Sequence, residues 1–200
     1  MATLGLTKLG AVNRMFWWVN QFSVSALDTG GTSDAAKMEE FLDQITLNIL
    51  AQGLAFNTQR SKSYTPAGSP YKITLASTVL AVRGAGNCAH RQFDAISGFA
   101  FDIDRYSNEY PDATVVMLDV MSNVAAWDDI PPAAKEYIAW CAARGYQQCN
   151  KGSPQHDEWL RQHCENASRA ARPIRVLPGD EPMGVQPYVP GSPQQQQQQR

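Results

Sequence analysis

The chain has 200 residues, of which 44% are hydrophobic, and a formal net charge of −2 at pH 7. This length fits one domain or two small ones. This slightly negative net charge does not indicate a basic surface for general nucleic-acid binding. No apolar run reaches the roughly 20 residues that a membrane span needs. The first residues lack the charged-then-apolar order of a signal peptide, so we expect synthesis and first folding in a reducing cytoplasm.

The first predicted helix covers residues 4–22, where apolar residues recur at helical spacing and form two stripes. Trp17 and Trp18 belong to an unusually aromatic run within it. Burial in a helical core is the ordinary explanation of such residues. The alternative is that one aromatic face contacts a second protein copy, because Trp is favoured at the centre of interfaces.

A second helix is predicted from Ser33 to Gly53, followed by an extended segment over 54–58. Ser33 or Asp34 can cap its start, and Gly53 suits the left-handed residue that ends a helix. Its apolar residues form two stripes on roughly opposite sides, so we expect contacts on both sides. The first stripe consists of Met38, Phe41, Leu42, Ile45 and Ile49, and the second of Leu47, Leu50 and Leu54.

Residues 54–130 are predicted to form an antiparallel β unit. Residues 60–71 are polar and contain two prolines, which predicts a loop. Strand-forming residues predict strands over 72–75, 79–83, 88–93, 98–101 and 113–121. The last of these is apolar on both faces, so we expect it to lie between two layers.

Two further helices are predicted, over 131–149 and from 153 to 172, before a Pro- and Gln-rich segment at 173–200 that cannot fold alone. The end of the last helix is basic, which suits either the helix dipole and solubility or a partner-binding surface. Its cations are Arg161, Arg169, Arg172 and Arg175. The predicted class is α+β: an antiparallel helical bundle from 1–53 and 131–172, an antiparallel β insert at 54–130, and a flexible tail at 173–200.

No metal or cofactor site is predicted. The sequence contains no C-x-x-C pair of the zinc-ribbon kind. Its four cysteines are Cys88, Cys141, Cys149 and Cys164. Cys141 and Cys149 would lie about 12 Å apart in one helix, too far for a disulfide. Cys149 and Cys164 could in principle join His156 and His163 around a metal, but small buried thiols and solvent-facing histidines are the simpler interpretation.

Several segments, in order, resemble the tail tubular protein A family of short-tailed phages, and together they extend over residues 5–172. Two segments depart from the usual family pattern: GLAFN at 53–57 stands for Gly-Trp-x-Phe-Asn, and VNQ at 19–21 stands for Ile-Gly-Glu. The similar segments are AVNRMF at 11–16, VSALD at 24–28, the stretch at 34–58, YKITL at 71–75, VLAVR at 79–83, WDDIPPAAKEYIAWCAARGYQ at 127–147 and GS at 152–153.

The resemblance implies a structural virion protein, assembled in the host cytoplasm, that acts as the tail adaptor and gatekeeper. Such a protein forms a dodecameric ring between the portal protein and the tail nozzle protein, and offers attachment to tail fibres. It carries the channel through which duplex DNA passes without specific binding, and it helps to retain and release the genome. The resemblance also implies that the helices at both ends of the chain form one bundle and that the β unit points toward the nozzle.

Within this interpretation two groups of residues become candidate sites. The portal or neighbour interface would contain Arg161, Arg169, Arg172, Arg175, Trp17 and Trp18. The channel lining would contain Asp102, Asp104, Glu109 and Asp112, because a lumen that DNA passes should be neutral or acidic; a solvated outer face is the alternative for these acids.

Two other functions are alternatives. A glycan hydrolase at the host envelope would need paired carboxylates, and Asp102 with Asp104 or Asp128 with Asp129 could serve. However, adjacent or alternate residues on exposed turns do not converge on one sugar bond, and no nucleophile or metal motif is present, so no catalytic residue is assigned. Another head-completion or stopper protein is the second alternative, although a plain helical connector would not need the large β insert.

Overall fold

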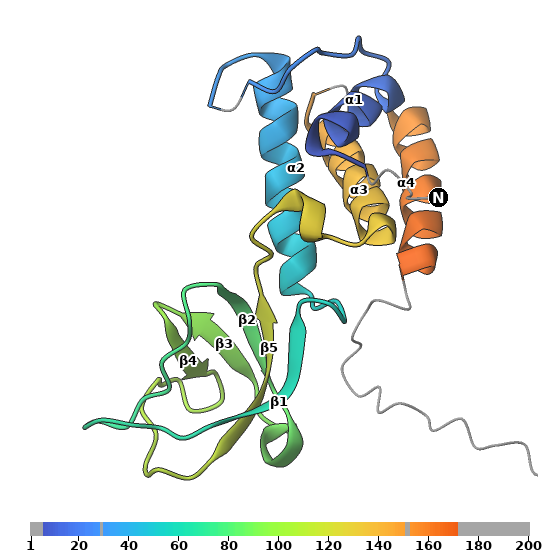
Figure 1. The fold of residues 1–200 in the computed structure, drawn as a ribbon. Coiled ribbons are helices and arrows are strands. Elements are labelled where there is room, and N and C mark those ends of the chain that lie inside the picture. Colours follow the sequence, from blue (N-terminus) through green and yellow to red (C-terminus); the bar gives the residue numbers. More distant parts are fainter. Residues whose placement is uncertain (1–5, 29, 151–152, 172–200) are drawn as a thin grey trace, which may run out of the picture.

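The computed structural model describes residues 6–28, 30–150 and 153–171. Helices gather at one end of the molecule and strands at the other (Figure 1), and the class is α+β. The predicted tail at 173–200, and with it Arg172 and Arg175, lies outside the described residues. Among the described residues no helix is both long enough and apolar enough to cross a membrane.

The helices are α1 (Lys8–Trp18), α2 (Asp34–Ala51), α3 (Pro132–Asn150) and α4 (Pro154–Ala171). Ser33 caps α2 as predicted, because its hydroxyl accepts a hydrogen bond from the backbone N–H of Ala36 at 3.2 Å. Gly53 follows with a φ of +88°, the left-handed conformation predicted for it. Residues 54–57 form a turn, closed by a bond from the N–H of Asn57 to the carbonyl of Leu54, where an extended segment was predicted.

Helix α1 is shorter than its predicted range of 4–22. Thr7 caps its start by accepting from the N–H of Gly10, and the helix ends at Trp18. The chain then reverses at Asn20, whose φ is +57°. Asn13 fixes the returning chain, since its side-chain amide both donates to and accepts from the backbone of Val24.

The helical part has one continuous apolar core. Helix α3 contacts each of the other three helices. Leu42 and Leu50 of the two predicted α2 stripes are fully buried, whereas Leu47 remains 42% exposed. Both stripes therefore face the core, except at Leu47. Other core residues are Val12, Met15, Phe16, Met38, Ile49, Ile138, Tyr146 and Leu160.

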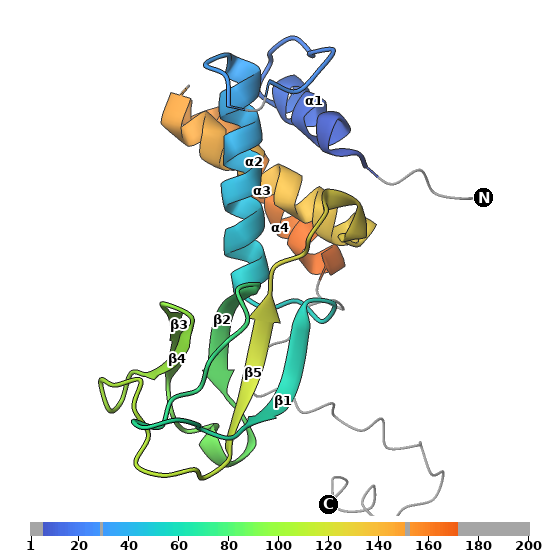
Figure 2. The same cartoon turned by 60° about the vertical axis from the view of Figure 1, so that its left-hand side comes forward.

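The β part contains an antiparallel sheet with strand order β1-β5-β2 and a β3-β4 hairpin (Figure 2). The strands are β1 (Thr58–Tyr64), β2 (Val79–Gly84), β3 (Phe93–Ile96), β4 (Phe99–Asp102) and β5 (Val116–Ser122), with short 3-10 turns at Gly86–Cys88 and Trp127–Asp129. A second apolar cluster fills the space between sheet and hairpin, and includes Ile73, Val82, Phe93 and Leu118.

Three strand predictions need correction. Residues 60–64 are not part of a loop, because they pair with β5 as the edge strand β1. Both faces of this strand are largely exposed, so it lacks the alternation that reveals a half-buried strand. Residues 72–75 make only isolated bridges, and residues 88–92 precede the strand that begins at Phe93.

Asn57 connects the two parts where α2 ends and β1 begins. Its buried amide donates to the carbonyls of Leu50 at 2.9 Å and Ser122 at 2.8 Å, and its side-chain oxygen accepts from the N–H of Leu54. Arg83 of β2 adds a bond to the carbonyl of Gln52. The direction of the sheet relative to α2 therefore depends on hydrogen bonds to named backbone atoms.

Candidate functional surfaces

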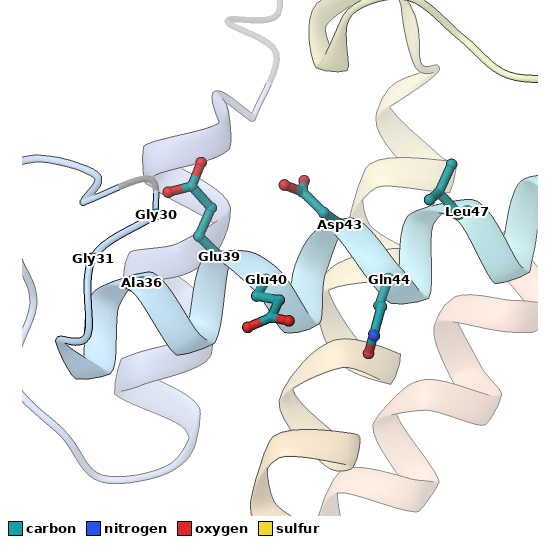
Figure 3. A pocket seen from close by; sticks show the side chains of 8 residues that line it. All are labelled: Gly30, Gly31, Ala36, Glu39, Glu40, Asp43, Gln44 and Leu47. Carbon is teal, nitrogen blue, oxygen red and sulfur yellow. The ribbon is translucent and has the colours of Figure 1, made fainter.

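An acidic groove runs along part of α2. It has a volume of about 320 Å³ and is bordered by Gly30 and Gly31 of the preceding loop. Figure 3 shows Glu39, Asp43 and Leu47 in one row along the helix. The remaining residues of the groove are Ala36, Glu40 and Gln44. The 3.6-residue period places acids and one exposed leucine on the same side of α2.

Lys8 of α1 partly neutralises this groove. Its ammonium group donates to Glu39 at 2.8 Å and to Asp43 at 2.9 Å. Burial opposes the charged form of Lys8, but the bonds to these two carboxylates outweigh it and raise the pKa of Lys8. Glu40 adds a third carboxylate and has no ion pair within the described ranges, so the groove keeps an excess of negative charge.

The two tryptophans proposed for an interface have different environments. Trp17 is 72% exposed, whereas Trp18 is buried and stacks on Trp140 of α3 with ring centroids 3.4 Å apart. The indole of Trp18 is part of the helical core and does not reach the surface, which corrects its assignment to an interface. Phe22, which belongs to the second apolar stripe predicted for the first helix, is 96% exposed. It was assigned to the first helix, but that helix ends at Trp18.

The two described arginines of α4 proposed for an interface, Arg161 and Arg169, also have different environments. Arg161 donates to both carboxylate oxygens of Glu158, at 2.6 and 2.7 Å, and contacts Glu165. Hydrogen bonds from Arg161 and then Gln162 lower the pKa of Glu158 to about 2. The charge of Arg161 is therefore compensated within its own helix. Arg169 is exposed in the last turn of α4.

The four acids proposed for a channel lining also have different environments, since one is buried and three are exposed. Asp102 is 1% exposed, forms an ion pair with Arg91, and accepts from the N–H of Arg105. Its carboxylate is buried and paired inside the β part, so it is not exposed to line a lumen, which corrects that assignment. The other three are exposed: Asp104 accepts from Gln92, Glu109 lies 3.7 Å from Lys72, and Asp112 accepts from Thr114. The bonds from Thr114 lower the pKa of Asp112.

The carboxylate pairs considered for a hydrolase have structural partners. Asp102 is paired with Arg91, and Asp104 bonds to the backbone of Gln92. Asp128 lies in a 3-10 turn, 3.8 Å from the ammonium group of Lys135. Among the described residues, no group of three or more His, Cys, Asp and Glu side chains could hold a metal ion.

A third exposed surface lies on the β part, on and after the β3-β4 hairpin. Ile96, Ile103 and Tyr106 are exposed there, and Tyr106 makes an edge contact with Phe101. The hairpin packs next to β2, at the opposite edge of the sheet from β1. Ile96 is the last residue of β3, and Ile103 and Tyr106 lie in the turn after β4, so no periodic pattern could have identified the three as one surface from the sequence.

The family described as Tail tubular protein matches residues 9–175 of the chain. The match therefore covers most of the chain and includes α1–α4 and the whole β part. No curated protein matches the chain.

Proposed function

This chain belongs to the tail tubular protein family of phages and is a structural component of the virion tail, and on that premise we propose that it is the ring-forming tail adaptor. The ring, a dodecamer, joins the portal protein to the tail nozzle protein. It encloses the DNA channel, acts as the gatekeeper that retains the genome until ejection, and carries fibre attachment sites.

One observation supports the ring more than any other: each subunit has two chemically different surfaces on its helical part. One is the acidic groove of α2, with exposed Leu47, and the other is the end of α4, where Arg169 is exposed and Arg172 and Arg175 follow in the sequence. A closed ring needs head-to-tail contacts between different surfaces, because identical surfaces would close a dimer. Opposite charges on the two surfaces suit such a contact.

In this proposal the two parts of the chain have separate tasks. Residues 1–53 and 131–172 act as one antiparallel helical bundle, supported by the core that α1–α4 share, and build the ring. Residues 54–130 form the β insert toward the nozzle, with Ile96, Ile103 and Tyr106 available for contact.

The aromatic surface of Trp17 and Phe22 is proposed to take part in contact with the portal or the next copy. Apolar side chains this exposed are a feature of protein interaction sites. The channel lining is proposed to include Asp104, Glu109 and Asp112, which have exposed carboxylates. Duplex DNA should then bind weakly at moderate salt, since few phosphates would be neutralised.

Light scattering on a mixture of portal and purified chain tests the proposal. We expect many copies to join each portal ring. Changing Arg169, Arg172 and Arg175 together to Glu should weaken joining while the circular dichroism of the subunit is unchanged. Glu40→Arg in the acidic groove should weaken it as well. A chain that neither assembles nor binds a portal, and instead cleaves a host glycan, would replace the adaptor by the hydrolase.

Combining the two changes separates neighbour contacts from portal contacts. If the groove of one copy receives the α4 end of the next, the combined variant should recover part of the assembly that the three Glu changes remove, because Glu40→Arg takes away the excess negative charge that repels the introduced glutamates. If the basic end contacts the portal instead, the combined variant should assemble less well than either single change. Asn48→Arg, on the same helix outside the groove, is the matched control.

A further inference from the structure

Helices α3 and α4 bring two cysteines together that are 23 residues apart in the sequence. The Sγ atoms of Cys141 and Cys164 lie 2.6 Å apart, at a partly buried position of the α3–α4 contact. A covalent S–S bond measures about 2.05 Å, so the two sulfurs are already close to bonding distance. We propose that Cys141 and Cys164 form a disulfide that joins α3 to α4 once the protein has left the reducing host cytoplasm.

The neighbouring contacts hold these helices in the register that the bond requires. Arg144, one turn after Cys141, donates to the carboxylate of Asp157 at 3.0 and 3.3 Å. Gln148, one turn further along α3, donates to the same carboxylate at 2.9 Å. Since these polar contacts fix α4 against α3, the two sulfurs can join without rearrangement of the helices.

The other two cysteines are poorly placed to compete. Cys88 is buried in the β part, within the second apolar cluster. Cys149 is exposed on α3, about 12 Å along the helix axis from Cys141, beyond the reach of a disulfide. The structure therefore assigns the bond to one pair.

The environment of Cys164 also suits the reaction. The guanidinium group of Arg144 is close enough to interact electrostatically with this residue, and a nearby cation stabilises the thiolate that reacts with an oxidant. The proposed oxidant is a low-molecular-weight disulfide. The Cys164 thiolate attacks one of its sulfurs and releases the first thiol, and the Cys141 thiolate then attacks the mixed disulfide and releases the second. Both protons pass to the released thiols.

The timing follows from the place of the protein in the virion tail. Thiols stay reduced in the cytoplasm where the particle is assembled, whereas disulfides persist outside the cell. Helix α4 would gain most from the bond, because Leu160 and Ala171 are the buried residues that its described part contributes. Both cysteines belong to the same subunit, so the bond does not depend on ring formation.

Peptide mass spectrometry on the full-length protein tests the bond. The protein is purified under reductant, incubated with an excess of oxidised over reduced glutathione, alkylated, and digested with trypsin without reduction. We expect peptides 136–144 and 162–169 to appear joined, with the loss of two hydrogen atoms, while Cys88 and Cys149 are alkylated. Alkylation of both Cys141 and Cys164 under these conditions, or a bond to another cysteine, would overturn the inference.

Thermal unfolding provides a second measurement. Oxidation should raise the melting temperature of the wild-type protein by roughly 5–15 °C, since a disulfide restricts the unfolded chain. Cys164→Ser should remove this rise and Cys149→Ser should retain it. An equal response of both variants to oxidation would contradict the assignment, even if Cys164→Ser lowers the melting temperature of the reduced protein.

Discussion

The helical part and the β part of this molecule are stabilised in different ways. The helical part has a large, continuous apolar core that all described helices share, and many of its polar contacts lie at the rim. The β part has a smaller core and depends on buried or half-buried polar groups, above all Asp102 with Arg91. Consequently, a conspicuous exposed residue in the helical part is available for assembly, whereas an acid in the β part first has to be checked for an internal partner.

The largest effect should come from the buried ion pair of the β part. Asp102→Ala leaves Arg91 without its carboxylate in a mostly buried site, which should cost about 3–5 kcal/mol of unfolding free energy. Hydrogen exchange should show faster opening of amides in the β part, with those of the helical core less affected. Asp104→Ala, an exposed neighbour, should cost less than about 1 kcal/mol. Equal losses in the two variants would show that burial of Asp102 is not what matters.

Core truncation in the helical part should have the next largest effect. Leu42→Ala removes a fully buried side chain from the core and should lower the unfolding free energy by about 2–5 kcal/mol, measured by denaturant unfolding. Ile45→Ala should follow with a smaller loss, because Ile45 is only partly buried. Leu47→Ala is the matched control on the same helix and should change stability little, since Leu47 is 42% exposed. If Leu42→Ala matched Leu47→Ala, Leu42 would not be a core residue.

The connection between the helical part and the β part should depend on Asn57. Asn57→Ala removes three hydrogen bonds and leaves the carbonyls of Leu50 and Ser122 without this donor, at a cost of about 1–3 kcal/mol. We further expect the helical and β parts to unfold less cooperatively, which calorimetry can detect as a broader or divided transition. Asn87→Ala, an exposed amide within the β part, should leave the transition width unchanged. A sharp single transition in both variants would assign the coupling elsewhere.

The smallest expected effect is a pH dependence within the helical part. The bond from Arg144 lowers the pKa of Asp157 in the folded state, so its stabilising contribution is present above the unfolded pKa near 4 and is lost as the pH falls through the lower folded pKa. Because the carboxylate is partly exposed, Asp157→Asn should cost at most about 1 kcal/mol at pH 7. The difference from wild type should vanish at strongly acidic pH, and its persistence there would exclude the ion pair as the cause.

Much of the helical part could be predicted because its signals are local. The cap at Ser33, the left-handed residue at Gly53 and the period of Leu42 and Leu50 depend on neighbours in the sequence. The end of α1 was missed, since apolar residues continue to Phe22 while the chain reverses at Asn20. Side-chain periodicity cannot show where the backbone leaves the helix.

The β part and the sites were less accessible because their signals depend on distant residues. The polar segment of β1 becomes a strand only through pairing with β5, nearly 60 residues later in the chain. In the sequence, Asp102 resembles the three exposed acids that follow it, whereas in the fold it is buried and paired with Arg91. The contact of Cys141 with Cys164 likewise depends on how α4 returns along α3, which no spacing in the sequence records.

The proposed head-to-tail ring is tested most directly by the mass of the complex that this chain forms with its portal protein. Native mass spectrometry of the purified complex counts the copies without reference to any assigned surface. We expect twelve copies of the 22.0 kDa chain on each portal ring, and less of this complex in the variant with Glu at positions 169, 172 and 175. A chain that stays monomeric beside an intact portal, or that joins it as closed dimers, would contradict the head-to-tail ring.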